Sequence, residues 1–159
     1  MRRLTHTDRR GRARMVDVSA KPATAREAVA RAVVRMRPQT LALVRANRIA
    51  KGNVLEVAQL AGVMAAKRTA ELVPLCHPIP LTDVQVRVEP AARGVAIEAH
   101  AKTVAPTGVE MEALVAAAVA ALTVYDMCKA ADRGMTIERV RLVLKRGGRS
   151  GTYRRPRER

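Results

Sequence analysis

Aromatic side chains are nearly missing from this chain of 159 residues, which has no Phe, no Trp and two Tyr. Hydrophobic residues still make up 48% of it, enough for the core of one domain. That core must be aliphatic, and Ala, Val and seven Met are available to fill it. Because stacking on unpaired bases needs aromatic rings, their shortage argues against a dedicated nucleic-acid-binding module.

Cysteines and common ligand-binding motifs are also scarce. The two cysteines, Cys76 and Cys128, give no disulfide framework and indicate reduced thiols in a cytoplasmic protein. No phosphate-binding GxxxxGK[ST] loop or dinucleotide-binding GxGxxG turn occurs, and no CxxC or HExxH spacing indicates zinc. No apolar run follows the first arginines, so we expect no signal peptide.

Acidic residues are few, with 14 Asp and Glu against 30 Lys and Arg, and the formal charge is +16. Such an excess attracts polyanions, which include nucleotide triphosphates, nucleic acids and acidic surfaces. Part of it lies in a basic N-terminal arm over residues 1–14 and a basic C-terminal tail over residues 152–159. Such tails are usually solvated, so we expect a single α+β domain over residues 15–151.

The longest uncharged run covers residues 113–125, inside a predicted helix. It is shorter than the roughly 20 residues that cross a bilayer, so we expect no membrane span. A helix that is apolar on every side is buried in a core or between subunits. Thr107 is the predicted N-cap, and Glu110 completes a capping box.

The other elements follow from periodicity and turn residues. We expect a strand over 15–18, a helix over 25–36 that Pro38 ends, a helix over 54–72 capped by Asn53, a hairpin of strands 81–89 and 95–103 with its turn at 90–94, and a last strand over 136–146. Three prolines hold residues 74–80 in a stiff loop. This order predicts an α+β fold, a ferredoxin-like antiparallel sheet covered on one face by helices, with an additional N-terminal helix.

Ionisable residues stand at both ends of the central helix. Asp126 and Lys129, three residues apart, are either a surface ion pair or a proton-transfer pair. Because both follow the uncharged run and lie near Cys128, we expect them in a partly buried pocket. Glu110 and Glu112 complement the helix dipole, or accept hydrogen bonds from a guanine-like base. Glu112 and Asp126 are roughly 21 Å apart along a helix. The ligand is therefore long, or each end serves a different site, or a partner subunit closes the gap.

The stiff loop and the basic residues provide the other candidates. His77 follows Cys76 and is a structural histidine, a functional one or a metal ligand. Adjacent residues rarely converge on one ion, so we expect no metal site. Lys51 adjoins Gly52 at a helix start, where backbone N–H groups favour anions. The remaining basic candidates, which could equally form a solvated face, are Lys21, Arg26, Lys67, Arg68 and Lys145.

Four segments together closely resemble the cyclic pyranopterin monophosphate synthase family, the C protein family of molybdenum-cofactor biosynthesis. They are THTDRRGRARMVDVSAK (5–21), KRTAELVPLCHPIPL (67–81), KTVAPTGVEMEALVAAAVAALTVYDMCKA (102–130) and VRLVLKRGGRSG (140–151). The resemblance runs from about residue 4 to residue 151, with the family's motifs in their order. One departure is Asn53, where the family is expected to have Asp, and both residues cap helices well.

The resemblance implies a lyase that converts (8S)-3′,8-cyclo-7,8-dihydroguanosine 5′-triphosphate to cyclic pyranopterin monophosphate and pyrophosphate. It implies no required cofactor, with Mg²⁺ as a candidate companion of the triphosphate. The expected assembly is a homohexamer, a trimer of dimers, with sites at subunit interfaces in the cytoplasm and with no membrane or nucleic-acid partner.

By the same resemblance, Asp126, Lys129 and Lys51 are catalytic residues. The matching substrate-binding segments contain Leu75, Cys76, His77, Met111 and Glu112, and we add Glu110 from the same helix turn. We further hypothesise that Arg26, Lys67 and Lys145 hold the triphosphate. Two alternatives remain, a basic RNA- or ribosome-associated binding module and a scaffold subunit without turnover.

Overall fold

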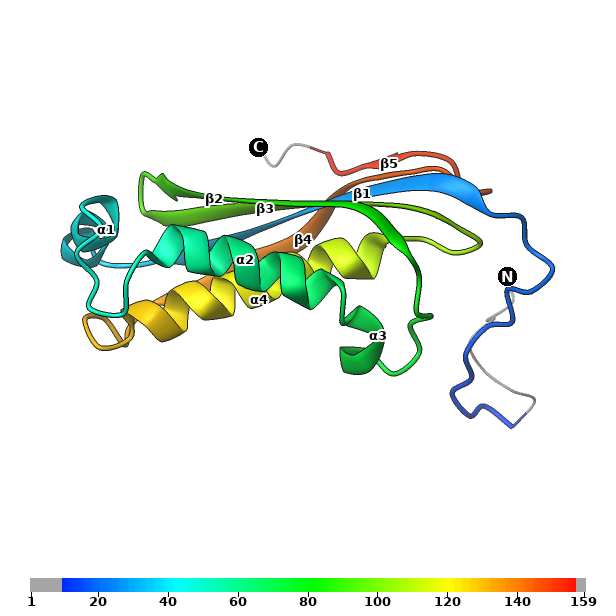
Figure 1. Ribbon diagram of the computed structural model, residues 1–159, viewed down its shortest axis with the longest axis horizontal. Coiled ribbons are helices and arrows are strands. Elements are labelled where there is room, and N and C mark those ends of the chain that lie inside the picture. The colour runs from blue at the N-terminus through cyan, green and yellow to red at the C-terminus, as the bar shows by residue number, and fades with distance from the viewer. Residues whose placement is uncertain (1–9, 157–159) are drawn as a thin grey trace.

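The computed structural model describes residues 10–156, which form a five-stranded antiparallel sheet with helices on one face (Figure 1). The elements are β1 (Thr24–Arg35), α1 (Pro38–Arg45), α2 (Val54–Ala66), α3 (Thr69–Leu72), β2 (Leu81–Ala91), β3 (Gly94–Ala105), α4 (Glu110–Cys128), β4 (Thr136–Arg146) and β5 (Tyr153–Arg154). The sheet order is β2-β3-β1-β4-β5, so four strands with α2 and α4 make the β-α-β-β-α-β arrangement of ferredoxin-like folds. The predicted α+β class is confirmed, and α1 is the additional helix toward the N-terminus.

β1 occupies the residues for which the sequence predicted a helix, so that prediction is wrong. Ala28, Ala30, Ala32 and Val34 alternate along the strand and belong to the core, each at most 1% exposed. A run of Ala and Val fits the helical repeat of 3.6 residues almost as well as the strand repeat of 2 residues. The neighbouring strands β3 and β4 take the backbone hydrogen bonds of β1, and this tertiary pairing decides its structure.

The connections around β1 also differ from the prediction. Pro38 begins α1 rather than ending a helix. Proline has no backbone N–H, and the N–H groups of the first helical turn have no partner within the helix, so nothing is lost at this position. Residues 15–18 form no strand. A short strand that the sequence did not predict, β5, pairs with β4 through Tyr153 and Arg154.

The start of α2 is confirmed, and its end is not. Asn53 is the N-cap, and its side-chain oxygen accepts a hydrogen bond from the Glu56 backbone N–H at 3.3 Å. The expected helix over 54–72 is interrupted at Lys67 and Arg68, so α2 and α3 are separate helices. The hairpin and the last strand are confirmed as β2, β3 and β4, with a tighter hairpin turn than expected.

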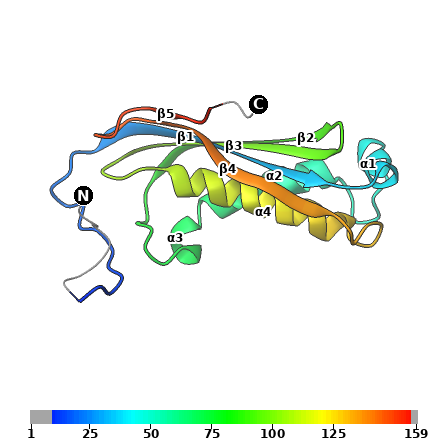
Figure 2. The same cartoon turned by 180° about the vertical axis from the view of Figure 1, so that it is seen from behind.

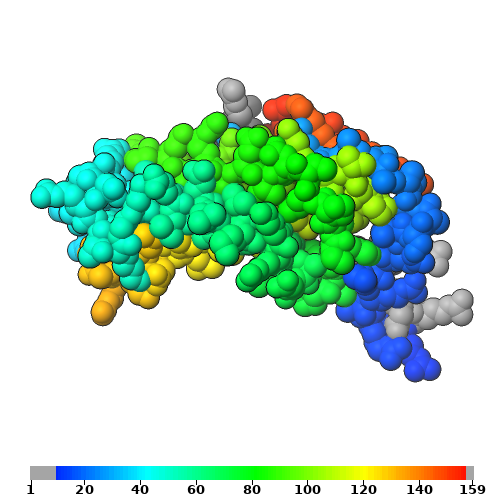
Figure 3. Space-filling view, in the orientation of Figure 1, coloured from blue at the N-terminus to red at the C-terminus, as the bar shows by residue number. Residues whose placement is uncertain are grey.

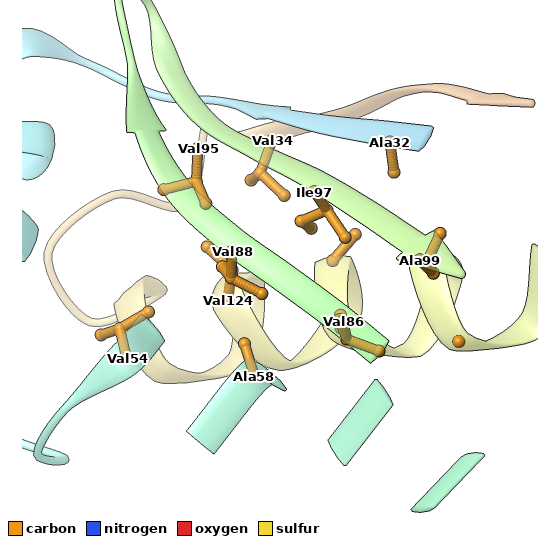
Figure 4. Close-up of a cluster of buried hydrophobic side chains, with 14 of the residues drawn as sticks. Ala32, Val34, Val54, Ala58, Val86, Val88, Val95, Ile97, Ala99 and Val124 are labelled. Atoms are coloured by element: carbon orange, nitrogen blue, oxygen red, sulfur yellow. The ribbon is translucent and has the colours of Figure 1, made fainter. Parts of the chain in front are cut away.

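α4 lies beside α2 on the same face of the sheet and packs against β1, β3 and β4. Its N-cap is Val109, which makes no side-chain hydrogen bond, so the predicted capping box of Thr107 and Glu110 is wrong. Small side chains let α2 and α4 approach each other closely. A Cβ on Gly62 of α2 would lie 3.0 Å from the carbonyl oxygen of Ala116 in α4. Figure 4 shows the aliphatic core that fills the space between the sheet and the two helices.

α4 is also the one helix in residues 10–156 that is long and apolar enough to cross a membrane by length and composition. Its alanine-rich faces are buried inside the domain, which is the pattern of a core helix. The helix runs along the sheet, so its ends lie far apart (Figure 2). The N-terminal end lies near α3 and the proline-rich loop, and the C-terminal end lies near the loop between α1 and α2 (Figures 1 and 2).

Candidate functional site

Lys51, Asp126 and Lys129 meet at the C-terminal end of α4. The Lys51 ammonium donates to Oδ2 of Asp126 at 2.7 Å and to the Asp126 backbone carbonyl at 3.0 Å. The Lys129 ammonium donates to Oδ1 of the same carboxylate at 2.7 Å. Each carboxylate oxygen of Asp126 therefore holds one lysine, and the fold joins two segments 75 residues apart.

The local backbone aims Lys51 at α4. Gly52 has a φ of 102°, and its N–H donates to the Ile49 carbonyl at 3.0 Å, which closes a turn just ahead of α2. A positive φ of this kind favours glycine. Asn53 then caps the helix. The sequence motif Lys–Gly–Asn therefore combines the lysine that contacts Asp126, the turn that presents it and the cap that fixes the turn.

These three side chains are exposed, with 47% of Lys51, 55% of Asp126 and 51% of Lys129 accessible. The expectation of a partly buried pocket around Asp126 and Lys129 is therefore wrong for the single chain. The hydrogen bonds from Lys129 and then Lys51 lower the pKa of Asp126 to about 2. Asp126 is a carboxylate at neutral pH, and it holds two ammonium groups that can bind anions or transfer protons.

A cavity of about 340 Å³ lies at the opposite, N-terminal end of α4. It brings together six residues that the sequence assigned to substrate binding: Leu75, Cys76, His77, Glu110, Met111 and Glu112. The proline-rich loop supplies one wall and the first turn of α4 another. Val16 and Val18, from the segment wrongly predicted as a strand, close a third side together with Lys21.

Burial sets the protonation of this cavity. Glu112 is only 4% exposed, and its burial raises the pKa of the carboxyl group above the usual value. Burial, and then the charge of Glu112, raise the pKa of the Cys76 thiol, which stays protonated at neutral pH. His77 Nε2 donates to the Val16 carbonyl at 2.7 Å, because a carbonyl oxygen can only accept.

The metal alternative for Cys76 and His77 gains no support from residues 10–156. No three His, Cys, Asp or Glu side chains of that part of the chain gather as ligands. A protonated thiol is also a poor ligand, because metals bind the thiolate.

A second cavity, of about 360 Å³, adjoins the first and shares His77 and Glu112 with it. Lys67 and Arg68 line this second space, at the interruption between α2 and α3. The break in the predicted long helix therefore has a consequence for the site, because it places two cations beside the buried carboxyl group of Glu112.

Arg26 and Lys145 line neither cavity. The Arg26 guanidinium donates to the carbonyls of Ala105 at 3.1 Å and Pro106 at 3.3 Å. These hydrogen bonds stabilise the segment that leads from β3 into α4. Lys145 is buried and donates to the Ser150 hydroxyl. Both lie on strand segments at the N-terminal end of α4, where β1, β3 and β4 pair.

The structure thus divides the predicted site residues between two ends of one helix. It also adds participants that residue types alone did not indicate, among them the Val16 carbonyl and the backbone of Gly108. The quoted motifs contain both residues. Their role follows only from the folded chain, because a backbone carbonyl has no sequence signature.

The fold and the site define a class of protein, a ferredoxin-like α+β domain with a lysine–aspartate–lysine cluster at one end and an acidic cavity at the other. Such a division suits an enzyme acting on a polyanionic small molecule. The chain belongs to the MoaC family, whose model matches residues 15–148.

Curated relatives are similar over nearly their whole length, and each is named cyclic pyranopterin monophosphate synthase. The protein of Thermomicrobium roseum is 65% identical over 157 residues, 98% of this chain and 95% of the relative. That of Cereibacter sphaeroides is 59% identical, covering 94% of this chain and 96% of the relative. That of Chloroflexus aurantiacus is 58% identical, covering 97% and 96%.

Proposed function

We infer that this chain is a lyase of molybdenum-cofactor biosynthesis. It converts (8S)-3′,8-cyclo-7,8-dihydroguanosine 5′-triphosphate to cyclic pyranopterin monophosphate with release of pyrophosphate, the reaction implied for the family it resembles. The observation that carries this conclusion is the Lys51–Asp126–Lys129 cluster, which the fold assembles from residues 75 positions apart. Relatives at 58–65% identity carry the name of that synthase.

The cluster is suited to proton transfer around a phosphorylated ligand. Asp126 stays ionised, so it orients both ammonium groups toward one point. Each ammonium has three hydrogens, and Lys129 uses one of them on Asp126. We propose that the remaining N–H groups of Lys51 and Lys129 donate to the reacting substrate, while Asp126 positions them or accepts a proton.

The opposite cavity is suited to the purine-derived ring. Glu112 and Glu110 lie at its edge and can accept hydrogen bonds from ring and amine N–H groups. Lys67 lines the adjoining cavity with Glu112, and we propose that it holds phosphate oxygens together with Arg26 and Lys145. Charge-assisted hydrogen bonds of this type are about twice as strong as neutral ones. Mg²⁺ bound by the triphosphate remains a prediction.

One protomer cannot easily bring both ends of α4 to one small molecule. Glu112 and Asp126 are separated by roughly 21 Å of helix. We propose that the Glu112 end of one protomer faces the Asp126 end of another, in a hexamer built as a trimer of dimers. Exposed apolar residues of the helical layer, Val57, Leu60 and Leu122, support such contacts. The cytoplasmic location likewise remains a prediction.

The first experiment measures pyrophosphate release and pterin formation from the cyclised nucleotide, generated in place by the radical enzyme that precedes it. We expect the wild type to release pyrophosphate, and we expect the turnover rate of Lys129→Ala to be lower by about 100-fold or more, as for removal of a proton-transfer group. Lys102→Ala is the matched control, because Lys102 is a lysine of β3 that is 3.7 Å from Asp83 and lines neither candidate cavity.

Full turnover by Lys129→Ala would remove Lys129 from the site. No turnover by folded wild-type protein would contradict the synthase function itself. In that case salt-dependent binding of generic RNA would favour the basic binding module, whose affinity must fall steeply with salt.

A further inference from the structure

An arginine-rich surface lies at the end of the molecule formed by α1, the β2–β3 turn and the α4–β4 turn. Figure 3 shows α1, in cyan, at this end of the space-filling view. Two cavities of about 640 and 740 Å³ open there and share Arg35 and Met36. We call these two adjacent cavities together the arginine groove. Its rim consists of Arg35, Arg37, Arg45, Arg93 and Arg133. None of these residues belongs to the site proposed above.

The arginine groove carries a strong excess of positive charge. One carboxylate lines it, Asp132, which is 2% exposed and already held by Arg37 at 3.2 Å. Arg93 and Arg133 are exposed, and neither guanidinium makes a hydrogen bond or ion pair with another residue of 10–156. These two cations are therefore available to an anionic partner.

The floor of the arginine groove is aliphatic. Met36 and Leu41 are core residues whose surfaces reach it, and Pro38, Ala42 and Ala46 continue it along α1. No aromatic ring lines either cavity, so the groove offers nothing on which a nucleic-acid base could stack. Two adjacent cavities together also exceed what one nucleotide would fill, which favours an extended ligand.

We propose that the arginine groove binds an extended acidic segment of a partner protein, in which carboxylates alternate with small aliphatic side chains. Guanidinium groups bind carboxylates through two parallel hydrogen bonds, while the aliphatic side chains bury against the floor. The Tyr125 hydroxyl donates to the Arg133 carbonyl at 3.0 Å, one residue before Asp126. A docked partner is thereby held beside the catalytic end of α4. This proposal does not depend on the reaction proposed above.

The test uses fluorescence anisotropy with the full chain and a labelled 14-residue peptide of alternating Glu and Ala at about 0.15 M ionic strength. We expect binding that is lost when Gln replaces every Glu. Arg93→Glu/Arg133→Glu should weaken it about tenfold or more, the scale of one lost charge-assisted contact. Arg87→Glu/Arg154→Glu makes the same change in net charge elsewhere and should weaken it no more than about threefold.

A third variant tests the floor without changing charge. Ala42→Gln places a larger side chain in the groove at an exposed position of α1. It should weaken peptide binding more than Leu43→Gln, a substitution on the same helix outside the groove. Equal losses of peptide affinity in the two double charge-reversal variants would overturn the proposal, because binding would then depend only on the net charge of the protein. Tighter, groove-dependent binding of polyuridylate would assign the surface to nucleic acid instead, and no peptide binding would also overturn it. Unchanged pyrophosphate release in Arg93→Glu/Arg133→Glu would confirm that the two sites are separate.

Discussion

Asp126 is exposed, yet its two oxygens are both taken by lysines, and this pairing sets its acidity. The folded-state pKa of about 2 lies below the usual aspartate value of 3.8. A depressed pKa of this kind favours the folded arrangement above the unfolded pKa, and the benefit disappears as pH falls through the folded value. The cluster is therefore intact through the neutral range and is lost only in strong acid.

The carboxyl carbon of Asp126, followed by NMR as pH falls, should titrate with a midpoint of about 2. Lys129→Ala should raise this midpoint toward 3.8, and Lys51→Ala should raise it less, since Lys129 is the larger cause. Lys102→Ala serves as the control and should leave the midpoint unchanged. A midpoint near 3.8 in wild type would contradict the paired geometry of the cluster.

At the scale of elements, the turn before α2 decides where Lys51 points. Gly52 has a φ of 102° and no atom within 4 Å of the place where a Cβ would stand. An alanine there would meet no steric clash. Its whole effect would come from backbone strain, about 1–2 kcal/mol for an L-residue in a left-handed conformation.

Gly52→Ala should therefore lower kcat more than it raises KM, because the turn relaxes and Lys51 moves away from Asp126. Gly151→Ala is a matched control, with a φ of 63° and open space around it but no role in the cluster. Thermal unfolding should show similar small losses for both variants, while pyrophosphate release should fall in Gly52→Ala alone. Equal turnover in both would show that the turn does not position Lys51.

At the scale of the whole molecule, the division of the site between the ends of α4 requires a second protomer in our proposal. Each site would then take Asp126 and Lys129 from one chain and Glu112 from another. Symmetric homo-oligomers readily build sites in this way, because the same two surfaces meet at every equivalent interface.

Mixed oligomers of Lys129→Ala and Glu112→Ala should recover activity that neither variant has alone. If the variants are co-refolded in equal amounts, about a quarter of the sites should combine two unaltered ends, given random assembly around equivalent interfaces. Turnover of the mixture measures this directly, and homo-oligomers mixed without refolding are the control. No recovery in confirmed mixed oligomers would show that both ends act within one protomer.

Part of the local geometry of the candidate site could be predicted from the sequence. Spacing placed Asp126 and Lys129 on one helix face, and the proline-rich motif placed Leu75, Cys76 and His77 in a stiff loop. Neither pattern could reveal that Lys51 lies against Asp126, because that contact depends on how α2 packs on α4. The same applies to His77, whose partner is the backbone of Val16.

The sequence by itself determined the local features: the alternating hairpin, the apolar central helix, the Asn53 cap and the motifs that relate the chain to its family. Only the tertiary structure decided that residues 24–35 form the central strand β1, because alanine and valine fit both periods and the choice depends on hydrogen bonds to β3 and β4. It also decided which distant residues meet at each end of α4. Local patterns record the geometry of neighbours along the chain, whereas a site is made by neighbours in space.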